Sequence, residues 1–295
     1  MRSAAVVRIL VAMSALLAAC DVAPRQMSSR AADDFGDTVV VAASARRIVS
    51  LNPATTELLY AIGAGSRMVG RTAYDVWPEA ARALPDLGPG LRPNVEAVLA
   101  VHPDLVILYA SDDNRDAARR LRAAGVATAA YRVDRIADVV RVTRALGALT
   151  GDTAAARTTT DSIRATLDRV RAATASLPKP TVFWPLYDQP LLAVGSGSYL
   201  NELIDIAGGT NIYAFMQAPS PRVTVEDLVQ RDPEVILLQP ASRERYLGDA
   251  RWRTLRAVRN GRMLAVDTNL VLRPGPRLGE AARSLAELLH PGAVR

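Results

Sequence analysis

The chain has 295 residues, of which 49% are hydrophobic and 5% aromatic, and its net charge is +6. This length and composition predict a folded protein with room for two domains and exclude a disordered chain. The arginines that supply the charge are spread beside acidic residues, without dense basic runs interleaved with aromatics, so we expect no nucleic-acid partner. The single cysteine excludes an internal disulfide framework.

The N-terminal segment has the layout of a targeting signal. Basic residues precede the apolar run 9–19 and Cys20, as in a secretory signal peptide, and the run is too short to span a bilayer. The tetrapeptide Leu-Ala-Ala-Cys is similar to the lipobox of bacterial lipoproteins, in which the chain is cut before the cysteine and the cysteine is lipidated. A secretory signal with a coincidental cysteine is the alternative. We predict a signal peptide over 1–19, lipidation of Cys20 and a flexible tether over 20–45.

Strands alternate with helices between residues 46 and 150, which predicts a lobe built on a parallel sheet. Asn52 follows the first predicted strand, and Tyr74 and Trp77 follow the second, so these side chains are expected at the carboxyl end of the sheet, where ligands bind. A short helix carries Glu96 in its first turn. The predicted strands are 47–51, 68–71, 105–109 and 127–133, and the other predicted helices are 56–62, 115–124 and 136–149.

A long helix is predicted over residues 152–177, which contain neither glycine nor proline. Ile163, Leu167 and Val170 recur at helical spacing and give it one apolar face. Such a helix would be roughly 39 Å long, which suits a strut between two lobes. One more surface helix in a single large domain is the alternative. We place the bridging helix at 151–178, between lobes at 46–150 and 179–295.

The sequence repeats itself on either side of this helix. Residues 94–109 read NVEAVLAVHPDLVILY, and residues 224–239 read TVEDLVQRDPEVILLQ, so that Glu96 matches Glu226 at a shift of 130. TELLYAIGAG in the first half also echoes NELIDIAGGT in the second. Two elements repeated in the same order predict two related lobes. Chance similarity between helix-turn-strand segments is the alternative.

The second half shows the same alternation. Trp184 and Tyr187 fall at or just beyond the end of its first strand, and Asp267 and Arg273 lie in a loop before the last helix. We expect these side chains at a strand-end site like that of the first lobe. The predicted strands are 181–186, 235–238 and 262–266, and the predicted helices are 199–207, 223–231, 252–258 and 278–290.

The residues favour binding over catalysis. Both histidines precede a proline at a helix end, so no pair is spaced for a metal, and we expect no resident metal or cofactor. The Gly-Ser-Gly-Ser run at 195–198 matches neither a nucleophile elbow nor a phosphate-binding loop. We therefore predict that the protein is not an enzyme, with an extracytoplasmic α/β enzyme as a minor alternative.

Five segments together resemble the periplasmic substrate-binding proteins of cobalamin and iron-siderophore ABC importers: RIVSLNPATTELLYAIGAG, PNVEAVLAVHPDLVI, AGGTNIY, VTVEDLVQRDPEVILL and RPGPRL. The resemblance is nearest to the cobalamin-binding branch. It implies an α/β fold of two Rossmann-like lobes joined by one long rigid helix, with little hinge motion. It also implies a monomer, held at the membrane by its lipid, that captures a corrinoid and delivers it to a permease dimer. A ferric siderophore or another metal chelate is the alternative ligand.

The family's motifs carry over to particular residues. Glu96 and Glu226 match the glutamates that pair with arginines of the permease dimer, one on each lobe. A glutamate favoured at a helix N-terminus by the dipole is the alternative reading of either residue alone.

The ligand site carries over less completely. Tyr74 and Arg273 match a tyrosine and an arginine of the family's cleft, whereas the two cleft tryptophans of the cobalamin-binding branch correspond to Gly90 and Ser220. The haem branch has its ligating tyrosine near Gly90, where this chain has Gly-Leu-Arg, which argues against haem. A siderophore would use Arg222 and Arg273 as anion-binding groups, unless Arg273 pairs with Asp267. The expected ligand-binding set is Asn52, Tyr74, Trp77, Trp184, Tyr187, Arg222, Asp267 and Arg273.

Overall fold

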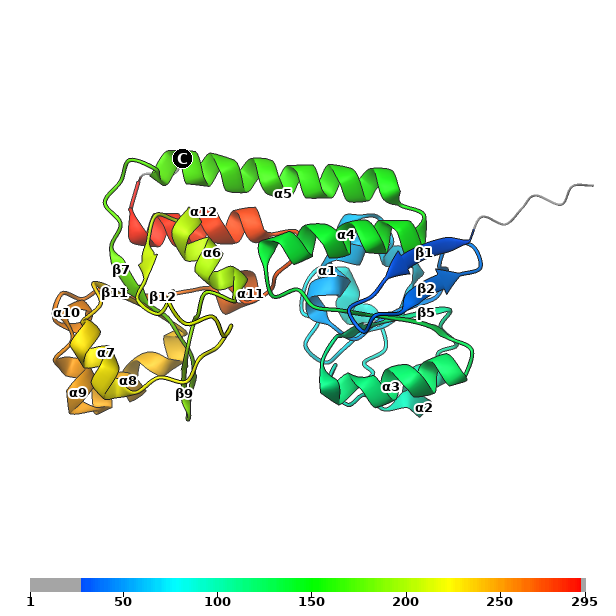
Figure 1. Ribbon diagram of the computed structural model, residues 1–295, viewed down its shortest axis with the longest axis horizontal. Helices are drawn as coiled ribbons and strands as arrows, with labels where there is room; N and C mark the ends of the chain where they lie inside the picture. The colour runs from blue at the N-terminus through cyan, green and yellow to red at the C-terminus, as the bar shows by residue number, and fades with distance from the viewer. Residues whose placement is uncertain (1–27, 293–295) are drawn as a thin grey trace, which may run out of the picture.

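The computed structural model describes residues 28–292 and consists of two lobes beneath a layer of long helices (Figure 1). The signal peptide and Cys20 lie outside the described residues. Each lobe has a four-stranded parallel sheet, in the order β4-β3-β5-β6 in the N-terminal lobe and β10-β7-β11-β12 in the C-terminal lobe. The predicted architecture of two Rossmann-like lobes joined by a long helix is confirmed.

The N-terminal lobe follows the predicted alternation closely. Its strands are β3 (Ile48–Ser50), β4 (Met68–Gly70), β5 (Leu105–Tyr109) and β6 (Ala127–Tyr131). Its helices are α1 (Pro53–Ala61), α2 (Val95–Ala100), α3 (Asp112–Ala123) and α4 (Ile136–Thr150), with short 3-10 turns at 65–67 and 79–83. Helix α1 begins three residues earlier than predicted, because the Asn52 side chain accepts a bond from the Ala54 N–H and Pro53 suits the first helical turn.

The predicted tether over 20–45 is wrong for residues 29–41, which form an antiparallel hairpin of β1 (Ser29–Ala32) and β2 (Thr38–Val41). Val39 and Val41 alternate with exposed residues and are buried against the lobe. In the turn, the buried Asp33 carboxylate accepts bonds from its own loop, from the Ala130 N–H of β6 and from the Arg122 guanidinium. The only sequence signal for the hairpin is a short alternation of apolar residues, and the side chain that anchors it is acidic. The segment therefore looks polar and without pattern in the sequence, and the hairpin was not predicted.

The bridging helix is α5 (Thr153–Thr174), which crosses above both lobes (Figure 1). Its buried face includes Ile163, Leu167 and Val170, as predicted. It packs on α4 of the N-terminal lobe and on α12 (Leu278–Leu289) of the C-terminal lobe. Gly279 makes the second contact close, since a Cβ there would lie 2.4 Å from Thr166 Cγ2. One apolar core therefore runs without a break from one lobe through α5 to the other.

The C-terminal lobe repeats the plan with additions. Its sheet strands are β7 (Thr181–Phe183), β10 (Thr210–Asn211), β11 (Val235–Leu238) and β12 (Met263–Ala265). Besides α12, its helices are α6 (Tyr199–Ile206), α7 (Val225–Arg231), α8 (Arg243–Gly248), α9 (Ala250–Arg253), α10 (Arg256–Arg259) and α11 (Thr268–Val271), with a 3-10 turn at 240–242. The strand predicted over 181–186 ends at Phe183, and an antiparallel hairpin follows, formed by β8 (Pro185–Asp188) and β9 (Leu191–Ala193).

Two reciprocal ion pairs link the lobes. Glu57 of α1 accepts two bonds from Arg277, which caps α12 of the other lobe, at 2.8 and 3.1 Å. In the opposite direction, Glu202 of α6 pairs with Arg135, which caps α4, and accepts a 2.7 Å bond from the next backbone N–H of that helix. These glutamates are the ones shared by the repeated segments TELL and NELI. The first helix of each lobe thus holds the N-terminus of the last helix of the other.

The strand order fixes where each lobe is open to a ligand. In the N-terminal lobe the chain runs from β3 to β4 on one side and then crosses to β5 on the other, and in the C-terminal lobe β7 is likewise flanked by β10 and β11. Ligands of such sheets bind outside the carboxyl ends of the strands at this reversal point. The candidate positions are therefore the crevices between β3 and β5 and between β7 and β11.

Candidate functional site

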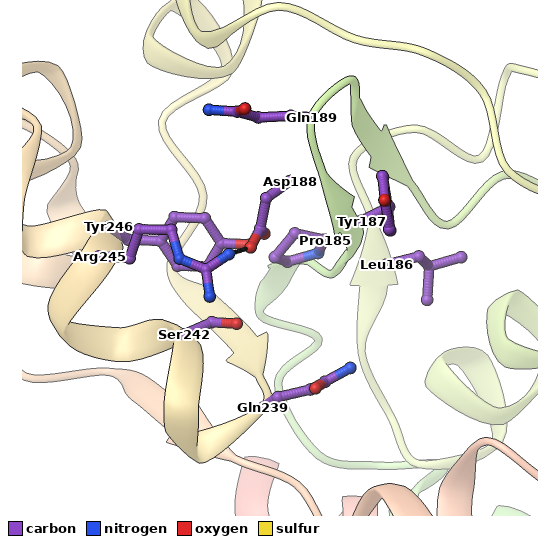
Figure 2. A pocket seen from close by; sticks show the side chains of 9 residues that line it. All are labelled: Pro185, Leu186, Tyr187, Asp188, Gln189, Gln239, Ser242, Arg245 and Tyr246. Carbon is purple, nitrogen blue, oxygen red and sulfur yellow. Dashed lines mark hydrogen bonds and ion pairs between the residues drawn. The ribbon is translucent and has the colours of Figure 1, made fainter.

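The crevice of the C-terminal lobe is open. A pocket of about 540 Å³ lies there, bounded by residues that follow β7 on one side and β11 on the other (Figure 2). Asp188 and Gln189 come from the β8–β9 hairpin, and Arg245 comes from α8. The full lining is Pro185, Leu186, Tyr187, Asp188, Gln189, Gln239, Ser242, Arg245 and Tyr246.

The matching crevice of the N-terminal lobe is covered by its own loop. Gly90 lies against the carboxyl end of β3, where a Cβ would be 2.2 Å from the Leu51 carbonyl oxygen. The Asn114 side chain fixes this loop by donating to the Gly90 carbonyl at 3.1 Å and accepting from the Arg92 N–H at 3.1 Å. The two lobes are alike in topology but differ in access to the reversal point.

The lobe junction gathers polar and charged groups between the two sheets. The Arg277 guanidinium lies over the Trp77 ring at 4.4 Å, so that a residue of one lobe covers an aromatic side chain of the other. Burial raises the pKa of Glu57 above its ordinary value, against the opposing hydrogen bond and charge of Arg277. Arg273 and Asp75 are near enough to influence the same carboxyl group. Glu57 is therefore the centre of a buried charge network at the junction.

Several polar atoms in this region lack a protein partner. Among the described residues, Asn52 Nδ2, Thr56 Oγ1, Asp75 Oδ1 and Arg273 Nε are buried without a hydrogen bond to another protein atom. Buried polar atoms are nearly always satisfied, so these four atoms keep unused hydrogen-bonding capacity for ligand or solvent atoms. Asn52, which also caps α1, and Arg273 were both expected at the ligand site.

The other predicted ligand residues divide into exposed and buried ones. Tyr74 and Tyr187 are 62% and 59% exposed, which leaves their rings accessible, whereas Trp77 is 36% exposed and Arg277 covers one face of its ring. Trp184 is 2% exposed and packs in the core, so its prediction as a ligand-binding residue is wrong. It directly follows β7, but its side chain packs into the core, and the β8–β9 hairpin that begins at the next residue was not predicted.

Two further predicted residues serve other contacts. The Asp267 side chain caps α11 by accepting a 2.9 Å bond from the Asn269 N–H, and no ion pair with Arg273 occurs within residues 28–292. The pairing considered for Asp267 and Arg273 is therefore absent from the described structure. Arg222 is exposed beside β9, where its backbone bridges Leu192.

Glu96 and Glu226 occupy equivalent places. Each is the second residue of a short helix, α2 or α7, and their side chains are 73% and 65% exposed. Each also pairs with an arginine from a later helix of its own lobe, Arg120 or Arg251. Hydrogen bonds to its carboxylate lower the pKa of Glu226; the larger effect comes from its own backbone N–H and the next from Arg251. Helices α2 and α7 both lie on the side of their lobe away from α5 (Figure 1).

Sequence reasoning missed the inter-lobe pair of Glu57 and Arg277 and the pocket pair of Asp188 and Arg245. The partners in these pairs are 220 and 57 positions apart, so no local pattern joins them. The repeated glutamate was the one available signal for the first pair.

The described residues contain neither a membrane-spanning helix nor a metal-binding cluster. No helix within residues 28–292 is long and apolar enough to cross a bilayer. Over the same residues, no three histidine, cysteine, aspartate or glutamate side chains come together to hold a metal ion.

Comparison with known proteins places these features in a family. A model described as periplasmic binding protein matches residues 48–270, and the chain belongs to that family. A cobalamin-binding protein of Halobacterium salinarum is 30% identical over 88% of this chain and 73% of its own length.

Two solved structures are also similar. The periplasmic vitamin B12 binding protein of Vibrio cholerae has a TM-score of 0.72 and 26% identity over 83% of this chain and 96% of its own. A periplasmic heme binding protein of Pseudomonas aeruginosa has a TM-score of 0.75 and 25% identity, over 84% and 94%. The fold and family are therefore those of periplasmic binding proteins, and these three relatives are named for cobalamin, vitamin B12 and heme.

Proposed function

We propose that the protein is the substrate-binding component of an ABC importer and that it captures a corrinoid between its lobes. The observation that carries this proposal is the chemistry of the accessible groups. Tyr74, Trp77 and Tyr187 expose aromatic rings at the carboxyl ends of the sheets, and the pocket beside Tyr187 contains one cation and one anion, which pair with each other. A corrinoid is a flat ring system with neutral carboxamide arms, which aromatic surfaces and uncharged hydrogen-bonding groups complement.

The direct test is calorimetric titration of the delipidated protein with cyanocobalamin, with a ferric siderophore and with haemin. We expect a dissociation constant in the micromolar range or tighter for cyanocobalamin alone. Ligand that binds only the folded state also raises the unfolding temperature, which gives an independent readout. Tight binding of haemin or of the siderophore in place of cyanocobalamin would refute the corrinoid assignment.

A ferric siderophore or another metal chelate is the alternative cargo, and it makes a different demand on the site. Its anionic oxygens would use Arg222 and Arg273 as partners, since charge-assisted bonds to guanidinium groups are strong. Arg222→Gln plus Arg273→Gln would then abolish siderophore binding. For a corrinoid we expect a smaller loss, of up to about tenfold, because its arms carry no charge.

Glu96 and Glu226 are proposed to dock the loaded protein on a permease dimer. A two-fold partner requires like charges at equivalent places, and two exposed glutamates on matched helices provide them. Glu96→Arg plus Glu226→Arg should abolish uptake in cells while leaving ligand affinity unchanged. A matched control reverses charge on α3 and α5 with Asp116→Arg plus Asp168→Arg, which should transport normally. Normal uptake by the double glutamate variant would exclude this docking surface.

The location follows from the same role. We propose that the protein acts as a monomer outside the cytoplasmic membrane, held there by a lipid on Cys20. Cys20→Ser should prevent lipidation and release the protein into the soluble fraction after cell lysis. Unchanged membrane fractionation of this variant would contradict the anchor.

A further inference from the structure

The pocket at the β7–β11 crevice has features that go beyond a general ligand cleft. Its polar walls come from three separate places in the chain: Asp188 and Gln189 in the hairpin turn, Gln239 after β11, and Arg245 in α8. In Figure 2 the Asp188 and Arg245 side chains meet, Gln189 lies above them and Gln239 below, and Tyr187 lies away from Arg245. The pocket is thus an assembled polar site.

Asp188 is held firmly in this site. Its carboxylate accepts bonds from the Arg245 guanidinium and from the Tyr246 hydroxyl. The Tyr246 ring is 6% exposed and stacks on Trp252 at 4.0 Å with an interplanar angle of 13°. Burial raises the pKa of Tyr246, so its hydroxyl stays protonated and continues to donate. The core of the lobe therefore fixes the position of Asp188 through Tyr246.

The pairing of Asp188 with Arg245 leaves the pocket without net charge. The guanidinium has five N–H donors, and only part of this capacity is used by Asp188, since the Arg245 side chain is 60% exposed. Asp188 cancels the positive charge without blocking the remaining donors. Gln189 and Gln239 are exposed and add amide donors and acceptors. The pocket consequently offers both hydrogen-bonding polarities and no net charge.

We propose that this pocket is a subsite for a carboxamide arm of the ligand and that Asp188 makes it selective for the uncharged arm over a carboxylate. The proposal rests on the proposed corrinoid function and specifies which part of that ligand this lobe recognises. A carboxamide presents one acceptor oxygen and two N–H donors, which match the two polarities of the walls. A carboxylate accepts only, and it would face Asp188 as well as Arg245.

The test compares cyanocobalamin with its monocarboxylic acids, in which one propionamide arm becomes a propionate of nearly the same size. The measured quantity is the ratio of the two dissociation constants at neutral pH. We expect the wild type to bind the amide about tenfold more tightly than the acid whose propionate enters the pocket. Asp188→Asn keeps the volume and the bond from Tyr246 but leaves Arg245 uncompensated. The ratio should then move by about tenfold toward the acid and become sensitive to salt.

Arg245→Gln should move the same ratio in the opposite direction, because it leaves the Asp188 carboxylate unpaired in the pocket. Asp116→Asn, which breaks a similar exposed pair on α3 with Arg119, is the matched control and should not change the ratio. Thermal unfolding of each variant verifies that it is folded. Failure of the wild type to bind either corrinoid would refute the proposed function. Binding by the wild type with a ratio that neither pocket variant changes would overturn the subsite.

Discussion

The ion pair between Glu57 and Arg277 is expected to carry a large share of the stability of the lobe junction. The side chains of Glu57 and Arg277 are 1% and 14% exposed, and two hydrogen bonds join them. Arg277→Ala leaves a buried carboxylate without its partner, which typically costs about 3–5 kcal/mol. At about 2–4 °C per kcal/mol for a chain of this size, the unfolding temperature should fall by roughly 6–20 °C.

The stability lost in the Arg277→Ala variant should depend on pH in a defined direction. Burial already raises the pKa of Glu57, and removal of Arg277 removes the main influence that opposes it. In the variant, the folded state therefore keeps a proton that an unfolded glutamate has released. Stability falls as pH rises wherever the folded state binds more protons, so the deficit should be larger at about pH 8 than at about pH 5.

The second inter-lobe pair provides the control. Arg135 and Glu202 link the lobes in the same reciprocal way, but their side chains are 47% and 23% exposed. Arg135→Ala should cost about 1 kcal/mol or less and show little dependence on pH. Calorimetric unfolding of both variants at the two pH values measures these quantities. Equal losses for Arg277→Ala and Arg135→Ala, or a deficit for Arg277→Ala that grows on acidification, would refute the reasoning.

Two further predictions concern the hairpin and the exposed tryptophan. Asp33→Ala removes the acceptor of four hydrogen bonds and should lower the stability by about 3 kcal/mol. Hydrogen exchange should then show lost protection over residues 29–41, while corrinoid affinity stays unchanged. Retained protection of these residues would contradict the anchoring role of Asp33. Trp77 is 36% exposed, whereas Trp184 and Trp252 are 2% and 3% exposed. Acrylamide should therefore quench the fluorescence of Trp77 alone, and bound cyanocobalamin should shield Trp77 from it. Unchanged quenching in the Trp77→Phe variant would show that acrylamide reaches another tryptophan.

The regular part of the fold could be predicted because its sequence signals are local. Strand β5 has the predicted bounds 105–109, since its apolar run is buried over its first four residues and ends where polar residues begin. Helix α5 could be predicted from its apolar spacing and from the absence of glycine and proline. The repeat at a shift of 130 located α2 and α7 together, and with them Glu96 and Glu226.

The parts that failed depend on contacts between distant residues. Trp184 directly follows a strand, where the sequence pattern alone does not distinguish a loop aromatic from a core one, and its side chain is buried in the core. The Asp188–Arg245 pair needs that hairpin and α8, neither of which has a long periodic pattern. For the same reason the sequence could suggest ligand residues near strand ends without showing that the pocket lies in the C-terminal lobe.

Under the proposed function, the two similar halves would meet two different requirements. A two-fold partner needs equivalent features, and Glu96 and Glu226 have kept equivalent helices, exposure and arginine neighbours. A single asymmetric ligand has no such need, and there the halves have diverged: Gly90 lies over one crevice, whereas the other crevice is an open pocket. The reciprocal pairs of Glu57 and Glu202 fix the lobes relative to each other. We expect these pairs to limit closure of the lobes, and under the proposed function selectivity for the ligand would then come from the side chains of the open crevice.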